Sequence, residues 1–228
     1  HKGVLNGQDL AGWEATYEAP LTYHYAGLEI GKCGPWSQGP VQLQTLALLN
    51  EMGVADWNPV STDFVHGVTE ALKLAFADRE AYYGDPDFVK VPLKQLLSRE
   101  YNRERSKEIS DRASLELRPG KISGFEVRMP EFDSSGRGDE RFSAMGIGEP
   151  TVSKKGETRG DTCHVDVVDR WGNMVSATPS GGWLQSSPVI PELGFCLNSR
   201  AQMFWLQEGL AATLAPGKRP RTTLTPSM

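Results

Sequence analysis

Cysteine is scarce in this chain of 228 residues, which contains only Cys33, Cys163 and Cys196. These three form no CxxC pair and have no metal-ligand spacing with the four histidines, so the sequence predicts neither a metal site nor a redox motif. One disulfide with a leftover thiol and three unpaired thiols are both compatible with this pattern. Cysteine usage therefore leaves a cytoplasmic and a periplasmic or secreted location open.

Long apolar runs and an excess of basic charge are also missing. The longest apolar stretch, around residues 46–49, is far shorter than the ~20 residues of a membrane span. With 24 basic against 29 acidic residues the net charge is -5, and no basic cluster is interleaved with aromatics, which argues against nucleic acid as a partner. A soluble globular protein with a small-molecule substrate fits this composition better.

The first 110 residues carry helical patterns. Residues 38–53 place apolar side chains near one face and end at Gly53, which predicts a core helix. A second and clearer helix is expected from the polar cap candidates at residues 61–63 to a stop at Gly84. A third, residues 96–110, is strongly charged, so we expect it on the surface.

From residue 111 to residue 161 this periodicity disappears. The stretch is rich in Gly, Pro, Ser and charge, which is typical of a mobile linker. At Thr162 an alternating strand begins abruptly, and "DRWGN" predicts a hairpin turn at Gly172 and Asn173 with "MVSAT" as the return strand. The N-terminal residues hold no apolar signal region, and the chain opens and closes in mid-pattern, so we expect a piece of a longer protein.

The abrupt strand start at Thr162 has two interpretations. A threonine hydroxyl becomes a useful nucleophile when a base lies next to it, and a threonine at a chain N-terminus has its own α-amine for this. That amine titrates near ~7.7–8, close to the best range for a general base. Such an N-terminus requires cleavage between Asp161 and Thr162. The plainer alternative is a threonine that merely begins a strand, where this residue is common.

The stretch "DTCHVDVVDRWGNMVSAT" resembles the start of the small subunit of the gamma-glutamyltranspeptidases, which are N-terminal-nucleophile hydrolases. Upstream, "HGVTEALKLAFADREAYYGDPDF" is similar to a helix of the same family, and "GQDLAGW", "APLTYHYAG" and "APGKRPRTTLTPS" match it in order. The matching residues at the proposed cut are Thr162, His164, Val167, Val168, Asp169, Gly172, Asn173, Val175 and Ser176.

The resemblance implies an α+β fold, the four-layer αββα sandwich of N-terminal-nucleophile hydrolases, incomplete at both ends in this chain. Residues 1–110 would belong to the large-subunit region, 111–161 to the mobile linker, and 162–228 to the small-subunit region. The two processed subunits would pair with each other, and a homo-oligomer is compatible. No cofactor or metal is implied.

The resemblance also implies site residues. Thr162 would attack the carbonyl of Asp161 and, once freed, an amide or peptide substrate of the glutathione type. Ser180 stands where the family has a threonine that hydrogen-bonds the nucleophile, and Thr222 and Thr223 stand where a Ser-Ser pair contacts the substrate carboxylate.

Several positions depart from the pattern of glutamate-binding members. Gly182 replaces an asparagine, and Arg200 and Met203 replace a glutamine and the aspartate that holds the substrate ammonium. Arg200 is then expected to favour a carboxylate. "GKRP", residues 217–220, carries Lys218 and Arg219, which either bind an anionic group or form a charged loop.

Three functions stay open at this point. The first is a self-processing amide hydrolase or acyltransferase with altered acyl specificity. The second is a true gamma-glutamyltransferase or glutathione hydrolase. The third is a non-catalytic relative kept as a structural or binding protein. The helix around His66 and Asp78 is expected to be structural, because buried ion pairs and a capped helix explain its residues.

Overall fold

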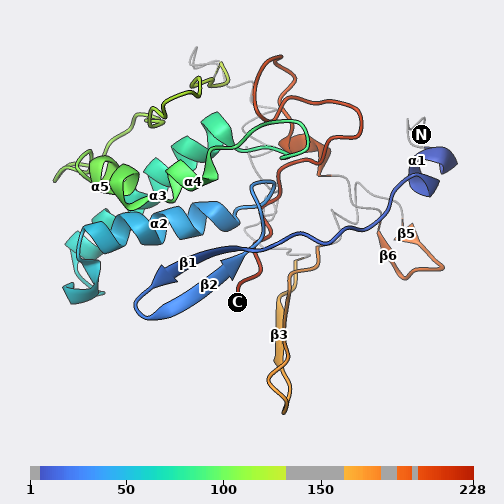
Figure 1. The fold of residues 1–228 in the computed structure, drawn as a ribbon, viewed down its shortest axis with the longest axis horizontal. Coiled ribbons are helices and arrows are strands. Elements are labelled where there is room, and N and C mark those ends of the chain that lie inside the picture. The colour runs from blue at the N-terminus through green and yellow to red at the C-terminus, as the bar shows by residue number, and fades with distance from the viewer. Residues whose placement is uncertain (1–5, 132–161, 181–188, 197–199) are drawn as a thin grey trace, which may run out of the picture.

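The computed structural model describes residues 6–131, 162–180, 189–196 and 200–228. The helices are α1 (Gly7–Ala11), α2 (Gly39–Glu51), α3 (Thr62–Tyr82), α4 (Leu93–Leu96) and α5 (Arg99–Ser106), with short 3-10 turns η1 (Val54–Asp56) and η2 (Ala201–Met203). The strands are β1 (Leu21–Tyr25), β2 (Leu28–Lys32), β3 (Val165–Val168), β4 (Met174–Ala177), β5 (Val189–Ile190) and β6 (Phe195–Cys196). Figure 1 shows α2 to α5 gathered on one side, with the β3–β4 hairpin projecting away from them.

The α+β class is confirmed, and the strands of the described residues pair as three two-stranded antiparallel sheets, β1–β2, β3–β4 and β5–β6. The C-terminal end extends the first of these, because Gly31 and Met228 exchange backbone hydrogen bonds of 2.6 and 3.0 Å. In the described part of the chain no helix is both long and apolar enough to cross a membrane.

Helix α2 lies at the centre of the core, as its sequence pattern predicts. It contacts α3, α5, β1 and β2, so apolar residues such as Val41, Leu43 and Leu48 are almost fully buried. The helix begins with a proline in its first turn, and the chain leaves it through Gly53, whose φ of 68° lies in the left-handed region that glycine tolerates. Packing on several sides explains why α2 carries a broad apolar surface.

Helix α3 begins and ends where the sequence predicts. The Ser61 side chain accepts a hydrogen bond of 3.1 Å from the Phe64 backbone N–H, which caps the first turn. After Tyr82 the chain turns into Gly84, where any Cβ would collide with the backbone carbonyl of Ala211. Gly84 is therefore needed for the close approach of two distant segments, whereas the helix itself ends at Tyr83, whose backbone is extended.

Helix α5 is shorter than the predicted surface helix and is partly buried. Asn102 and Arg105 are buried, and the Arg105 guanidinium donates to the Arg118 carbonyl at 2.6 Å and lies 3.4 Å from Asp78. The buried carboxylate of Asp78 needs hydrogen-bond donors, and α5 supplies two of them, Tyr101 and Arg105. Part of the charged face of α5 is therefore buried and hydrogen-bonds to Asp78 in the core, whereas its composition predicted an exposed helix.

Residues 111–131, expected to be the first part of a mobile linker, instead pack on the helices. Ile122 is buried in the main core, and Phe125, Val127 and Met129 pack against it. The Gly120 backbone N–H donates to Asp78 at 2.6 Å, and Tyr82 donates to the Gly120 carbonyl at 2.6 Å. This part of the linker expectation therefore does not hold, and residues 132–161 lie outside the described part.

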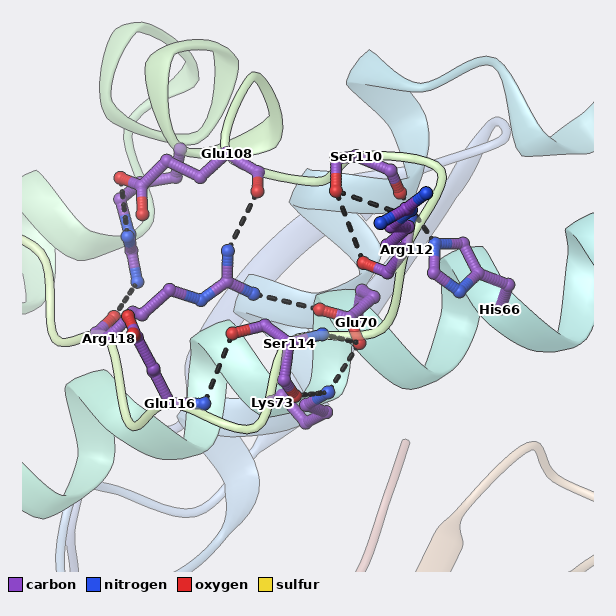
Figure 2. A network of polar contacts seen from close by, with 10 residues as sticks. His66, Glu70, Lys73, Glu108, Ser110, Arg112, Ser114, Glu116 and Arg118 are labelled. Atoms are coloured by element: carbon purple, nitrogen blue, oxygen red, sulfur yellow. Dashed lines mark hydrogen bonds and ion pairs between the residues drawn. The ribbon is translucent and has the colours of Figure 1, made fainter.

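A second polar cluster holds the same segment at its beginning. The carboxylate of Glu70 on α3 is buried and accepts from Lys73, from the Ser114 backbone N–H at 3.3 Å and from Arg118 at 2.8 Å. Figure 2 shows these side chains converging on Glu70, with His66 near Ser110 at the edge of the cluster. The interactions account for His66 and Glu70 as structural residues, the plainer interpretation of this helix.

Candidate functional site

The strand after the proposed cut pairs with its neighbour in a fixed register. Val165 lies opposite Ala177 and Val168 opposite Met174, and the same pairing extends back to a bridge between Thr162 and Ser180. The turn forms as predicted: Asp169 Oδ1 accepts from the backbone N–H groups of residues 171 and 173, at 2.8 and 2.9 Å, and Gly172 has a φ of 87°. The local sequence of the hairpin therefore fixes which residue faces Thr162.

The Thr162 and Ser180 side chains meet across this bridge. Thr162 Oγ1 donates to Ser180 Oγ at 3.1 Å, and the neighbouring Cys163 backbone N–H donates to the Pro179 carbonyl at 3.0 Å. Thr162 is exposed and Ser180 is half-buried. The contact that the sequence predicts for Ser180 is present, whereas Asp161 and Gly182 lie outside the described residues.

Arg200 and the threonine pair form a second group of contacts. Arg200 is 5% exposed, and its Nη2 donates to Thr223 Oγ1 at 2.8 Å. Thr222, which precedes Thr223 in the chain, is also buried, and its backbone N–H donates to the Trp36 carbonyl at 2.8 Å. A buried guanidinium against a hydroxyl is an arrangement suited to a carboxylate or another anion, because both groups can donate hydrogen bonds to it.

Two ion pairs fasten the segment that carries the threonine pair to the end of α3. Arg221 Nη2 contacts both carboxylate oxygens of Glu80, at 2.9 and 3.1 Å, and both side chains are largely buried. Arg219 contacts Asp85 through Nε at 3.1 Å and Nη2 at 2.9 Å. These pairs join residues more than 130 positions apart, so no local sequence signal could have found them.

For "GKRP" the sequence left two roles open, binding an anionic group or forming a charged loop, and these ion pairs support the charged loop for Arg219. Its guanidinium also contacts Glu18 and lies 5.5 Å from the centre of the Trp36 ring. Burial alone raises the pKa of the Asp85 carboxyl, but hydrogen bonds from Arg219 outweigh it and lower that pKa. Lys218 lies over the Phe88 ring at 5.8 Å and takes no part in these ion pairs.

A cavity of about 690 Å³ lies between the N-terminal segment, β2 and the C-terminal end. Its lining includes Trp36, Lys32, Arg219 and Ser176. Of the described residues predicted for the site, Thr162, Ser180, Arg200, Thr222 and Thr223, none lines this cavity. The described residues contain no group of three or more His, Cys, Asp or Glu side chains that could hold a metal ion.

Comparison with known proteins decides the family. The model of a family described as Gamma-glutamyltranspeptidase matches residues 1–228. The chain belongs to the gamma-glutamyltranspeptidase family. The resemblance drawn from the motifs is thereby confirmed.

Relatives with both hydrolase and acylase names occur in this family. The glutathione hydrolase proenzyme of Bacillus subtilis subsp. natto is 30% identical over 99% of this chain and 36% of its own length. The acylase ACY 1 proenzyme of Pseudomonas sp. strain SE83 is 33% identical over 99% of this chain and 35% of its own length. This chain thus spans about a third of the length of the curated relatives it matches.

Two solved structures support the same assignment. The structure of LmbA2991T421A is 54% identical, with a TM-score of 0.78 over 100% of this chain and 36% of that one. The cephalosporin acylase from Bacillus halodurans is 27% identical, with a TM-score of 0.71 over 99% of this chain and 34% of that one. The helices and strands described above are therefore arranged as in these relatives.

Proposed function

We propose that the protein is a self-processing amide hydrolase or acyltransferase whose nucleophile is Thr162, freed as an N-terminal residue by cleavage after Asp161. The observation that carries the proposal is the 3.1 Å hydrogen bond from Thr162 Oγ1 to Ser180 Oγ at the first rung of the β3–β4 hairpin. A second hydroxyl at this distance fixes the direction of the nucleophile's oxygen, as an orienting group must.

The chemistry needs two acyl transfers at the same oxygen. In processing, Thr162 Oγ attacks the carbonyl of Asp161, and the peptide C–N bond breaks, which frees the Thr162 α-amine and leaves Asp161 esterified to Oγ. Water then hydrolyses this ester, which releases the Asp161 carboxylate and the Thr162 hydroxyl. In turnover, the Thr162 α-amine takes the hydroxyl proton as Oγ attacks the substrate amide, then returns the proton to the leaving amine. The acyl-enzyme ester is resolved by water or by an acceptor amine, which gives hydrolysis or transfer.

The subunits that such a cut creates would stay together through contacts across it. Arg221 with Glu80 and Arg219 with Asp85 join residues after the cut to residues before it, and Thr222 is anchored to the Trp36 backbone. We place the two pieces in one composite domain, the four-layer αββα sandwich, to which this chain contributes α2, α3 and the strand hairpins.

We propose an acyl pocket that prefers a carboxylate without an α-ammonium. Arg200 is a buried cation and already donates to Thr223, so the two together offer hydrogen bonds to an anion. An ammonium beside Arg200 would be repelled, and Met203 offers no acidic side chain to compensate. Glutaryl-type amides fit this arrangement better than γ-glutamyl amides, and relatives named acylases belong to the same family.

Two other functions stay as candidates. A genuine gamma-glutamyltransferase or glutathione hydrolase is favoured by the relatives that carry this name, and it would need an acidic group from elsewhere to hold the ammonium. A non-catalytic relative would retain the fold without a free α-amine on Thr162.

Trapping the acyl-enzyme tests the nucleophile directly. Full-length processed protein is mixed with a glutaryl anilide, quenched in acid within one turnover and digested for mass spectrometry. We expect the added acyl mass on the peptide that begins with Thr162, and none at residue 162 of Thr162→Ala, which should remain as the uncut precursor. Ser180→Ala serves as the matched control, because Thr162 should still be acylated in this variant, with a rate lowered by at most about tenfold. Anilide turnover with the acyl group on another residue would contradict the proposal.

A further inference from the structure

The hairpin face that carries Thr162 continues as a ladder of polar cross-strand pairs. Backbone register places the next pairs on the same face, because side chains two residues apart on a strand point the same way. The intervening positions, on the other face, carry apolar pairs such as Val167 opposite Val175. The three successive polar pairs, which we call the polar ladder, are Thr162–Ser180, His164–Thr178 and Asp166–Ser176.

His164 uses both ring nitrogens within this ladder. Its Nε2 lies 2.9 Å from Asp166 Oδ2, and its Nδ1 lies 2.8 Å from Thr178 Oγ1. Hydrogen bonds from Ser176 and then from His164 lower the pKa of the Asp166 carboxyl, so that it is an ionised acceptor near neutral pH. Since a carboxylate can only accept, Nε2 carries a proton, and whenever the ring is neutral Nδ1 accepts from the Thr178 hydroxyl.

This arrangement argues against His164 as the base for Thr162. A general base must lie within about 2.6–3.2 Å of the group whose proton it takes. Both nitrogens already have partners, and neither partner is the Thr162 hydroxyl.

We propose instead that His164 is a positioning residue for the nucleophile. Asp166 fixes the tautomer of the His164 ring, and the ring in turn holds the Thr178 side chain in place. Thr178 lies two residues before Ser180 on the return strand, so the His164–Thr178 hydrogen bond closes the rung next to Thr162 and Ser180. Without it the last rung frays, and Ser180 is no longer held against Thr162 Oγ1. Misplacement of a reacting group by about 1 Å costs on the order of a hundredfold in rate.

The ladder also reaches the part of the chain before the proposed cut. Ser176 Oγ accepts from the Ser227 backbone N–H at 3.1 Å, and the buried Lys32 ammonium donates to Ser227 Oγ at 2.5 Å. The rung beside the nucleophile is therefore tied, through Asp166 and Ser176, to the β2 strand. The proposal rests on the proposed role of Thr162 and assigns roles to residues that lie outside its first rung.

Kinetics of matched variants test the positioning role. His164→Gln keeps an amide near Nε2 but cannot reach Thr178, and Thr178→Val removes the hydroxyl at nearly constant shape. We expect each to lower kcat by about ten- to a hundredfold while KM stays within about twofold, in full-length processed protein. Thr178→Ser should recover kcat to within about threefold, because it restores the hydroxyl. Val167→Thr, the converse exchange on the other face of β3, should behave as wild type.

A second measurement does not depend on activity. In protein with ¹⁵N-labelled histidine, the His164 signal is assigned by its loss in His164→Gln, and in the neutral ring it should show the proton on Nε2. A Nδ1–H tautomer would overturn the proposal, as would wild-type kcat in both His164→Gln and Thr178→Val. Thr162→Ala, measured alongside, distinguishes a failure of the proposed nucleophile from a failure of the positioning role. If Thr162→Ala retains turnover, Thr162 is not the nucleophile, whatever the state of His164. If only Thr162→Ala is inactive, the positioning role alone fails.

Discussion

Replacing Asp78 by asparagine should release the segment at residues 112–131 from the helices. Asp78 is fully buried and accepts four hydrogen bonds. Its Oδ1 accepts from the Gly120 backbone N–H at 2.6 Å and from Arg105 at 3.4 Å, and its Oδ2 accepts from Gln44 at 2.6 Å and from Tyr101 at 2.8 Å. An asparagine has only one acceptor oxygen, so in either orientation an NH₂ group faces two donors.

The magnitude follows from which donors can adapt. If the NH₂ group takes the Oδ2 position, Gln44 can rotate its amide and the Tyr101 hydroxyl can accept, whereas Arg105 still loses its buried countercharge. Each unmet buried donor costs about 1–3 kcal/mol, so we expect a loss of about 2–4 kcal/mol. At about 1.4 kcal/mol per factor of ten, this loss raises the equilibrium constant for local opening of the segment roughly thirty- to several-hundredfold.

Hydrogen exchange measures this opening directly. Peptides covering residues 112–131 should exchange faster in Asp78→Asn by that factor, or until their protection is lost. Glu104→Gln on α5 is the matched control, since its partner Lys107 and Glu104 itself are exposed and its loss should leave exchange unchanged. Unchanged protection of residues 112–131 in Asp78→Asn would refute the role given to this network.

Three further outcomes are expected. Arg219 lowers the pKa of Asp85, so the pair stabilises the fold fully above the unfolded pKa of about 3.9 and loses this contribution as the pH falls further. The stability of Asp85→Asn should therefore depend less on pH than that of wild type below about pH 4. Equal slopes for the two proteins would contradict this. Gly84→Ala should lower the free energy of unfolding by about 1–3 kcal/mol, because its Cβ meets the Ala211 carbonyl. Gly7→Ala is the control, since its Cβ meets nothing within 4 Å, and its stability should not change. Equal denaturant midpoints for the two variants would argue against the close approach at Gly84. Glutaryl anilides should exceed γ-glutamyl anilides in kcat/KM by roughly ten- to a hundredfold, and the reverse order would mean that another residue holds the ammonium.

Local signals in the sequence predicted the parts of the fold that depend on neighbours. The Ser61 cap, the left-handed Gly53 and the Gly172 turn are each set within a few residues, so their positions could be stated in advance. The Thr162–Ser180 contact was expected from the resemblance to the gamma-glutamyltranspeptidases, and in the structure the hairpin register brings the two residues together.

Residues that act over long separations could not be predicted in this way. Residues 111–131 have no periodic pattern, because their order comes from Asp78 and Glu70 rather than from a helix or strand of their own. The burial of Arg105 and the Arg221–Glu80 pair likewise depends on partners far along the chain. The tautomer of His164 depends on Asp166, whose role becomes visible only when the hydrogen bonds are known.

The most direct test of the account is the mass of the full-length precursor after incubation. The account predicts two fragments whose junction is the bond between Asp161 and Thr162, with Thr162 carrying a free α-amine. Thr162→Ala should stay intact, and Thr162→Ser should be cut more slowly than wild type, because serine retains the hydroxyl nucleophile. Wild-type precursor that stays intact, or a cut at any other bond, would contradict the central claim that Thr162 becomes the nucleophile.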